Sequence, residues 1–224
     1  MFNIAELKSA LIVSCQPDGD EAFYTSDFAR GMAEAAALGG AAGLRLNGPD
    51  TIAHIKAKVA LPIIGIWKQV HPGSDVYITP TLATAEAVLA AGAEILALDA
   101  TSRPRPAESL DTIVAALRGR VCLMADISTL EEGLAAEALG FDCMGTTLSG
   151  YTPYSPQQPG PDYGLLSALV ERLRIPIIME GRIWTPEEAG MAIARGAHAV
   201  VVGSAITRPQ LITKRYVEQL TVNS

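Results

Sequence analysis

Eight short apolar segments alternate with helix-like segments along the 224-residue chain, and this alternation predicts an α/β fold, a closed (β/α)8 or TIM barrel. The apolar segments are almost continuously hydrophobic, as is typical of parallel strands with both faces covered. The segments between them are rich in alanine and carry capping residues at their ends. A doubly wound open sheet is the alternative, but no G-x-G-x-x-G sequence follows the first apolar segment. The barrel is therefore favoured.

Each strand and helix is expected from its own local pattern. The predicted strands are residues 10–16, 41–47, 61–68, 94–101, 121–127, 142–148, 175–181 and 199–206. The predicted helices are residues 26–39, 49–58, 79–92, 107–118, 128–140, 164–173, 185–196 and 207–219. The helix over 79–92 opens with the same Thr-Pro pair as the helix over 185–196, so both are expected to begin there.

Three helix starts are predicted in more detail. Thr185 precedes a proline and two carboxylates, which is the pattern of an N-cap followed by Pro at N1. Ser128 lies three residues before Glu131, which predicts a capping box. The first helix is expected to take Ser26 or Asp27 as its N-cap.

The composition describes a folded protein with no strongly charged surface. Hydrophobic residues make up 49% and charged residues 18%, which excludes a disordered chain. The net charge is −7 and neither lysine nor arginine forms a run, which argues against nucleic acid or an anionic membrane as partner. No linker divides the chain, so residues 1–224 are expected to form one domain. No apolar run approaches the roughly 18 residues of a membrane span, so a cytoplasmic location is expected.

The cysteines and histidines do not form a recognisable metal or disulfide pattern. The three cysteines, Cys15, Cys122 and Cys143, are far apart and predict neither a disulfide framework nor zinc. They are expected to be buried, although Cys15 lies near a strand end and a nucleophilic role stays open. The three histidines, His54, His71 and His198, are dispersed, and His198 is expected to be structural. Neither a metal nor another cofactor is predicted.

Charged and polar residues collect at one end of the predicted strands. The strands begin with Pro, Ala, Val or Leu, whereas their carboxyl ends carry Gln16, Arg45, Asn47, Lys68, Asp99, Asp126, Thr146, Thr147, Glu180 and Arg182. A solvated rim would place charge at both ends of the strands. Active sites of TIM barrels lie at the carboxyl ends, so we expect the functional site there.

Lys68 and Glu180 form the most informative pair of strand-end residues. They close the third and seventh predicted strands, which lie opposite each other in an eight-stranded ring. Each lies an even number of residues after the proline of its own strand, so each projects to the same side as that proline. If that side is the lumen, an amine and a carboxylate face each other and can serve two faces of one carbon. A structural salt bridge is the alternative.

The loops after the seventh and eighth strands predict a phosphate site. Barrels commonly bind phosphate with these two loops, which here read "EGRIWTP" and "VGSAITRP". Glycine permits close approach of the backbone, a hydroxyl adds a donor, and arginine adds charge-assisted donors. The candidate phosphate-binding residues are Gly181, Arg182, Gly203, Ser204 and Arg208.

Several motifs resemble one enzyme family over about residues 10 to 208. They read "VSCQP", "NGPDTIAHIK", "PIIGIWK", "YITPT", "LALDATSRPRP", "ADISTLEEG", "GFDCMGTTLSGYT" and "EGRIWTPEEA". Together they resemble the N-acetylmannosamine-6-phosphate 2-epimerases. The resemblance implies a cofactor-independent isomerase of sialic acid and amino-sugar catabolism, usually a homodimer, that interconverts the 6-phosphates of N-acetylmannosamine and N-acetylglucosamine.

The resemblance also implies roles for individual residues. The lysine and glutamate that transfer protons in the family correspond to Lys68 and Glu180. The implied sugar-binding residues are Gln16, Arg45 and Asp126, joined by Thr147 and Tyr151 of the "GTTLSGYT" motif. Two segments depart from the family: the acidic residues 18–21 and the Ala-Glu pair at 107–108. The loop over 149–163 is expected either to close over substrate or to be a fixed surface loop.

The implied chemistry is exchange of the proton on C2 of the open-chain sugar through an enolate. In the direction of glucosamine, Lys68 would remove the proton and a neutral Glu180 would deliver one to the other face; the reverse assignment of the two roles stays open. An acidic role requires Arg182 to point away from Glu180 towards phosphate. Two alternatives stay open: a phosphate-binding barrel enzyme of histidine, tryptophan or thiamin biosynthesis, and a catalytically silent sugar-phosphate-binding regulator.

Overall fold

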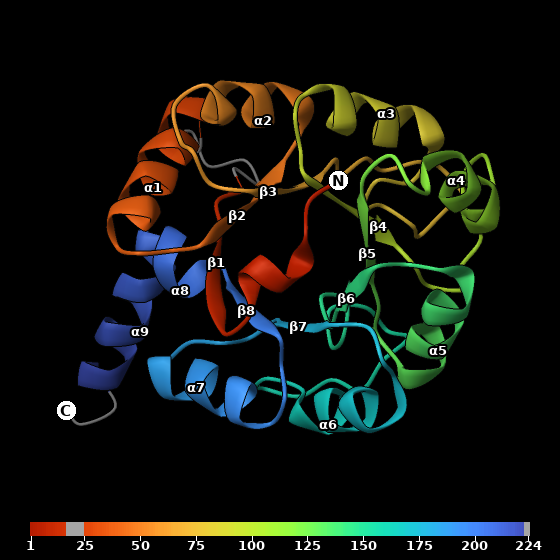
Figure 1. Ribbon diagram of the computed structural model, residues 1–224. Coiled ribbons are helices and arrows are strands. Elements are labelled where there is room, and N and C mark those ends of the chain that lie inside the picture. The colour runs from red at the N-terminus through yellow and green to blue at the C-terminus, as the bar shows by residue number, and fades with distance from the viewer. Residues whose placement is uncertain (17–24, 222–224) are drawn as a thin grey trace.

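The computed structural model describes residues 1–16 and 25–221, and these form a closed barrel of eight parallel strands in chain order (Figure 1). The strands are β1 (Ala10–Ser14), β2 (Gly43–Asn47), β3 (Ile63–Ile66), β4 (Ile95–Asp99), β5 (Cys122–Asp126), β6 (Cys143–Gly145), β7 (Ile177–Glu180) and β8 (Ala199–Val202). The barrel closes where β1 pairs with β8, from Ala10 opposite Ala199 to Val13 opposite Val202. The predicted TIM barrel is confirmed.

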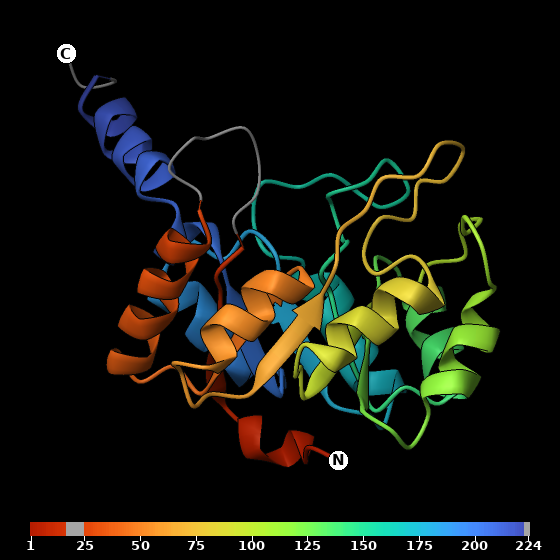
Figure 2. The same cartoon turned by 90° about the horizontal axis from the view of Figure 1, so that it is seen from above.

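Helices surround the barrel in a ring (Figure 1). They are α1 (Ser26–Leu38), α2 (Pro49–Lys56), α3 (Leu82–Ala90), α4 (Leu110–Leu117), α5 (Leu130–Leu139), α6 (Tyr163–Arg172), α7 (Pro186–Ala194), α8 (Ser204–Thr207) and α9 (Pro209–Thr221). A short 3-10 helix, η1 (Ile4–Leu7), lies across the amino-terminal end of the barrel, opposite the loops that follow β3 and β6 (Figure 2).

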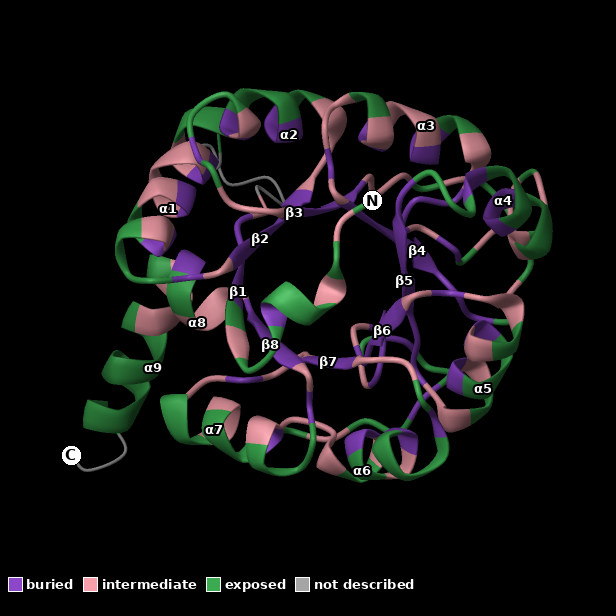
Figure 3. Cartoon of the chain, in the orientation of Figure 1, coloured by how far each residue is buried: buried purple, intermediate pink, exposed green. Residues whose placement is uncertain are grey.

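The end of the chain differs from the prediction. The expected strand over 199–206 stops at Val202, because the backbone turns into the helix α8 at Ser204. The expected helix over 207–219 is replaced by α8 and the separate helix α9. In Figure 2, α9 stands away from the barrel, and Figure 3 shows that it is mostly exposed. None of its described residues is buried.

One predicted helix cap is confirmed and two are displaced by one residue. Thr185 caps α7 and forms a capping box with Glu188. The predictions for α1 and α5 are wrong: the N-caps are Thr25 and Thr129. In α5 the capping partner is Glu132, whose carboxylate also accepts hydrogen bonds from the residue before the cap. In each case the extended threonine nearest the first turn supplies the oxygen.

The start of α3 was also predicted wrongly. The helix begins after Thr81, whose side chain caps it, and not at the Thr-Pro pair two residues earlier. Thr79 of that pair is buried with φ 46°, and its hydroxyl accepts a hydrogen bond from the backbone N–H of Trp67. Glu108, in the Ala-Glu pair expected from the sequence to depart from the family, accepts a hydrogen bond from the backbone N–H of Leu82 and so ties the β4–α4 loop to this helix start.

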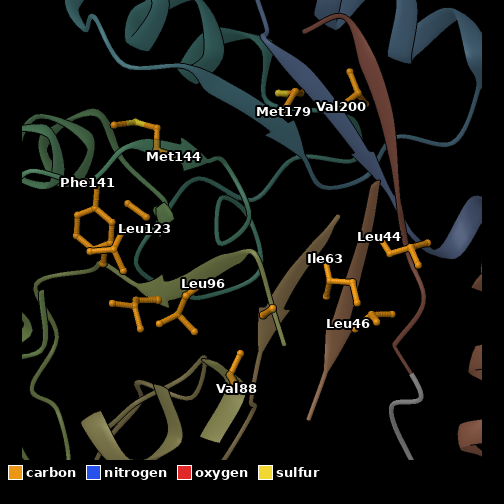
Figure 4. Packing of buried hydrophobic residues seen from close by; sticks show 14 of the residues in the cluster. Leu44, Leu46, Ile63, Val88, Leu96, Leu123, Phe141, Met144, Met179 and Val200 are labelled. Carbon is orange, nitrogen blue, oxygen red and sulfur yellow. The ribbon is translucent and has the colours of Figure 1, made fainter. Parts of the chain in front are cut away.

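The hydrophobic core has two layers, one on each face of the barrel wall. The outer layer lies between strands and helices and contains residues such as Leu44, Leu96, Leu123 and Met179 (Figure 4). The inner layer fills the lumen with aliphatic and sulfur-containing side chains, among them Ile12, Ile64, Ile66, Cys122, Met124 and Ile178. Successive residues of each strand alternate between these layers. Each fully buried aliphatic side chain contributes about 1.5–3 kcal/mol of transfer free energy.

This alternation also brings the site residues inward. Continuing the lumen positions to the carboxyl end of each strand leads from Ile12 to Ser14, from Met124 to Asp126, and from Ile178 on to Glu180. The lumen therefore changes from apolar to polar at its carboxyl end, where the loops rise above the barrel (Figure 2). Among the described residues, no helix is long and apolar enough to cross a lipid bilayer.

Candidate active site

A cavity of about 200 Å³ opens at the carboxyl end of the barrel, where the sequence predicts the functional site. Most of the predicted site residues line it: Gln16, Arg45, Lys68, Thr147, Tyr151, Glu180, Gly181, Arg182, Gly203 and Ser204. Asp126 is fully buried and in contact with Arg45. Arg208 lies at the end of α8 and is not among the described residues that line the cavity.

Arg45 joins two carboxylates within the barrel. Its Nη1 and Nη2 donate to the two oxygens of Asp126 at 3.1 and 2.6 Å, which is a bidentate pair. The same Nη1 lies 3.1 Å from Oε2 of Glu180. The Arg45 and Asp126 side chains are 1% and 0% exposed, whereas Glu180 is 14% exposed and faces the cavity. Glu180 is therefore the member of this cluster that a substrate can reach.

Two hydroxyl groups from the residues directly after β6 complete the cluster. Thr147 Oγ1 lies 2.6 Å from Asp126 Oδ1 and 3.1 Å from Glu180 Oε2. Thr146 is buried, and its hydroxyl donates to the backbone carbonyl of Glu180 and accepts from its N–H. The backbone and the carboxylate of Glu180 are both held by neighbouring side chains, which fixes its direction into the cavity.

Burial shifts the pKa values of Glu180 and Arg45 in opposite directions. Burial raises the pKa of Glu180; the positive charge of Arg45 acts against this and the negative charge of Asp126 adds to it. For Arg45, burial lowers the pKa, but the charges of Asp126 and Glu180 outweigh it and raise the pKa above its usual range. The cluster thus combines a permanently charged guanidinium with a carboxyl whose pKa burial raises, against the opposing effects of Arg45, Lys68 and the hydrogen bond from Thr147.

Lys68 approaches the cavity from the opposite side of the ring. It follows β3, which lies across the barrel from β7, and its backbone N–H donates to Oδ1 of Asn47 at 2.9 Å. Ile64 and Ile66 both point into the lumen, so the even spacing predicted for Lys68 leads inward. The structure brings Lys68 and Glu180 to one cavity, as predicted. The carboxylate of Glu180 pairs with Arg45.

The loop after β7 has two residues in the left-handed region. Gly181 has φ 109° and Arg182 has φ 56°, so the chain turns sharply after Glu180. The Arg182 side chain points to the β6–α6 loop: Nε donates to the carbonyl of Gly160 at 2.7 Å and Nη1 to that of Ser149. Its guanidinium also lies 5.3 Å from the centre of the Tyr151 ring. Glu180 is therefore paired with the guanidinium of Arg45, and the guanidinium of Arg182 holds the β6–α6 loop in place.

Sequence reasoning missed Tyr77 as a site residue. The β3–α3 loop folds back as a small hairpin, in which Gln69 donates its N–H to the carbonyl of Tyr77, and this brings the ring to the cavity. Burial and the nearby charges of Asp126 and Asp99 raise the pKa of Tyr77 to about 12. Tyr77 belongs to the "YITPT" motif, which was noted in the sequence. Because Tyr77 lies in a loop, the alternation of side chains along a strand could not predict where its ring points.

Asp99 lies outside the cavity, although it ends a strand. It is fully buried, and Arg103 and Thr101 donate to its carboxylate at 2.7 and 2.6 Å. Arg105 donates to the backbone carbonyl of Asp99. The carboxylate therefore organises the β4–α4 loop. The predicted departure at residues 18–21 lies outside the described residues.

The cysteines and His198 have structural surroundings. All three cysteines are buried and free of disulfides. Burial raises the pKa of Cys15 to about 12, so this thiol stays protonated and is a poor nucleophile. His198 Nε2 lies 2.9 Å from the carbonyl of Ile4 and ties β8 to η1. Within residues 1–16 and 25–221, no three metal-ligating side chains come together.

A barrel whose mouth combines an amine, a carboxyl and two glycine-containing loops belongs to the class of (β/α)8 enzymes with the groups needed to transfer protons on a small anionic substrate. A profile of the family described as "Putative N-acetylmannosamine-6-phosphate epimerase" matches residues 29–222. The chain belongs to this family.

Two relatives are similar in sequence to this chain along nearly its whole length. Relatives from Clostridium perfringens and Caldanaerobacter subterraneus, both described as "Putative N-acetylmannosamine-6-phosphate 2-epimerase", are 52% and 49% identical. These alignments cover 96% of this chain in both cases, and 98% and 92% of the two relatives. A solved structure of the N-acetylmannosamine-6-phosphate 2-epimerase from Clostridium perfringens superposes with a TM-score of 0.93 at 50% identity, covering 96% of this chain and 95% of that one.

More distant structures share the fold alone. A thiamine phosphate pyrophosphorylase from Pyrococcus furiosus superposes with a TM-score of 0.61 at 17% identity, covering 92% of this chain and 90% of that one. This likeness shows the barrel fold and carries no information about the reaction of this chain.

Proposed function

We propose that the protein interconverts N-acetylmannosamine 6-phosphate and N-acetylglucosamine 6-phosphate by exchanging the proton on C2, in the catabolism of sialic acid and other amino sugars. The observation that carries this proposal is that Lys68 and Glu180, from opposite sides of the barrel, line one cavity. Membership of the epimerase family supports the same conclusion.

The proton on C2 becomes acidic only when C1 is an aldehyde, so the open-chain sugar is the reacting form. Lys68 in its neutral form takes the C2 proton, and the electron pair of the C–H bond moves into an enolate between C1 and C2. Glu180 in its acid form gives a proton to the other face of C2 and becomes a carboxylate. The raised pKa of Glu180 supports the acid role, because it keeps the carboxyl protonated at higher pH.

Other cavity residues bind and orient the sugar. Gln16, Tyr151 and Thr147 line the cavity around the reacting groups, Arg45 pairs with Glu180, and the buried Asp126 holds Arg45 in place. The phosphate is anchored where the loops after β7 and β8 meet, by Gly181, Gly203 and Ser204. The guanidinium of Arg182, which the sequence assigned to the phosphate, is instead held by the carbonyls of Gly160 and Ser149. Arg208 lies at the far end of α8, which gives no support to a direct contact.

The protein acts in the cytoplasm as a homodimer, with residues 1–224 as one domain. The helix α9 supports the dimer, because its side chains Tyr216, Val217 and Leu220 are 71%, 53% and 71% exposed. An apolar groove beside it, lined by residues such as Leu11, Ile193 and Val200, offers a surface on which a second copy can bury such side chains. Light scattering tests this: Leu220→Asp with Tyr216→Asp should give monomers, and a monomeric wild type would contradict the dimer.

The activity is tested with each of the two sugar phosphates in deuterium oxide, followed by proton NMR. The expected result is formation of the other epimer with solvent deuterium at C2. Lys68→Ala should lose this exchange while phosphate-sugar binding stays measurable. Binding of either sugar without exchange by the wild type would instead indicate a silent regulator. If the wild type binds neither sugar phosphate, the protein would instead be a phosphate-binding barrel enzyme that acts on a different substrate.

A further inference from the structure

Tyr77 is a half-buried residue of the active-site cavity. It lines the cavity, and its ring packs against the apolar cluster in the barrel lumen. Within residues 1–16 and 25–221, no hydrogen-bond partner of its hydroxyl group is found. Tyrosine hydroxyls in buried surroundings usually have such a partner, so this hydroxyl is available to a ligand.

The backbone at Tyr77 is fixed by its neighbours. Its carbonyl accepts a hydrogen bond from the N–H of Gln69 at 2.9 Å. The carbonyl of the next residue, Ile78, accepts from the N–H of Asp99 at 3.1 Å, which joins the loop to the end of β4. The ring is therefore positioned before a ligand binds, and binding requires little further ordering of this side chain.

The surroundings keep the hydroxyl of Tyr77 protonated, so that it can donate. Burial and the negative charges of Asp126 and Asp99 raise the pKa of Tyr77 to about 12. The positive charges of Arg103 and Arg45 act against this and are outweighed. At neutral pH the phenol carries its proton and can donate one hydrogen bond to an acceptor oxygen.

Tyr77 lies across the cavity from the proposed phosphate anchor. The loops of that anchor follow β7 and β8, whereas Tyr77 follows β3, which lies opposite β7 in the barrel. In the proposed reaction the phosphate is on C6, and C2 lies between Lys68 and Glu180. The substituents of C1 and C2 are then at the end of the sugar away from the phosphate, on the side of β3.

Two apolar side chains accompany Tyr77 on this side. Ile66, at the end of β3, and Ile78 both line the cavity and belong to the lumen cluster. A hydroxyl donor beside two aliphatic side chains complements an acetamido group, which has a carbonyl oxygen and a methyl group. Both sugars of the proposed reaction carry this group on C2.

We propose that Tyr77, Ile66 and Ile78 form the subsite for the acetamido group, in which the Tyr77 hydroxyl donates to the acyl oxygen and the two isoleucines contact the methyl group. This inference rests on the proposed function. It makes Tyr77 a residue that selects N-acetylated sugar phosphates over hexose phosphates, because a hydroxyl on C2 offers neither the acyl oxygen nor the methyl group.

The test measures binding of two open-chain ligands by calorimetry. N-acetylglucosaminitol 6-phosphate and glucitol 6-phosphate differ only in the substituent on C2, and neither has the C1 aldehyde that exchange requires. The wild type should bind the N-acetylated ligand more tightly. Tyr77→Phe, which keeps the ring, should bind that ligand about five- to tenfold more weakly and glucitol 6-phosphate within about twofold of the wild type.

Two controls accompany this comparison. The hydroxyl of Tyr163 donates to the carbonyl of Glu188 at 2.9 Å, away from the cavity, so Tyr163→Phe should leave both affinities unchanged. The N-formyl analogue of the first ligand lacks the methyl group, so the wild type should bind it about fourfold more weakly than the N-acetylated ligand.

Three results would overturn the proposal. Unchanged binding of the N-acetylated ligand by Tyr77→Phe would show that the hydroxyl does not contact it. An equal loss for both ligands would place the hydroxyl at an oxygen that they share. Equal binding of the N-formyl and N-acetyl ligands would exclude the contact with the methyl group. None of these measurements needs turnover, so a failure of the proposed epimerase activity is seen separately, in the deuterium oxide assay.

Discussion

Replacing Arg45 with methionine should destabilise the protein strongly. The guanidinium is fully buried, donates twice to Asp126 and touches Glu180. Removing one partner of a buried ion pair leaves an uncompensated charge and costs about 3–5 kcal/mol. For a protein of this size, about 2–4 °C of Tm are lost per kcal/mol, so Tm should fall by about 6–20 °C. Methionine fills a volume similar to that of arginine. The decrease in Tm therefore reflects the lost charge more than lost packing.

The loss should depend on pH in a defined direction. Without Arg45, the pKa of Glu180, which burial already raises, rises further above its unfolded value of about 4.3. The folded variant then binds protons more tightly than the unfolded chain, so its stability is greatest at low pH and falls as pH rises through the folded pKa. The difference between variant and wild type should be larger at pH 8 than at pH 5.

The assay is thermal unfolding followed by circular dichroism at both pH values. Arg30→Met is the matched control, because Arg30 pairs with Glu34 at 2.8 Å on the partly exposed surface of α1. Such an exposed pair is screened by solvent and contributes little to stability, so this variant should remain close to the wild type. If Arg45→Met unfolds within about 2 °C of the control, the buried cluster does not carry the energy assigned to it.

Three further variants and measurements test other parts of the structure. Gly65→Ala places a Cβ 2.5 Å from Cγ1 of Val88, so denaturation should show a loss of about 1–3 kcal/mol; wild-type stability would contradict this packing. Arg182→Met releases the carbonyl of Gly160, so limited proteolysis should cut the β6–α6 loop faster than in the wild type, and equal rates would argue against this fastening. Cys15 is buried with a pKa of about 12, so it should react with thiol reagents much more slowly in the folded than in the unfolded protein; rapid labelling of the folded form would exclude that environment.

Sequence reasoning located the strands well because parallel strands covered on both sides are continuously apolar. Strand parity then placed Lys68 and Glu180 in the lumen, since regular strands alternate strictly between their two faces. Helix ends were less certain. At α5, two adjacent hydroxyl residues, Ser128 and Thr129, can each act as a cap, and the backbone selects one of them through the position of the first turn.

The partners of long side chains could not be predicted in the same way. Arg182 and Arg45 both lie near Glu180 in the barrel topology, and the sequence does not show which guanidinium turns towards it. The structure shows that Arg45 does, because β2 directs it inward, whereas Arg182 follows a left-handed turn and reaches the carbonyl of Gly160. Tyr77 was missed because a hairpin in a loop determines its position.

The most direct test of the central claim, that Lys68 and Glu180 act from opposite sides on C2, is deuterium incorporation by variants of each residue. N-acetylmannosamine 6-phosphate is incubated in deuterium oxide with the wild type, Lys68→Ala and Glu180→Gln. Lys68→Ala should show no exchange at C2. Glu180→Gln should exchange the C2 proton of this substrate without forming the other epimer, because only Lys68 remains. Normal exchange in Lys68→Ala, or normal epimerisation by Glu180→Gln, would contradict the claim.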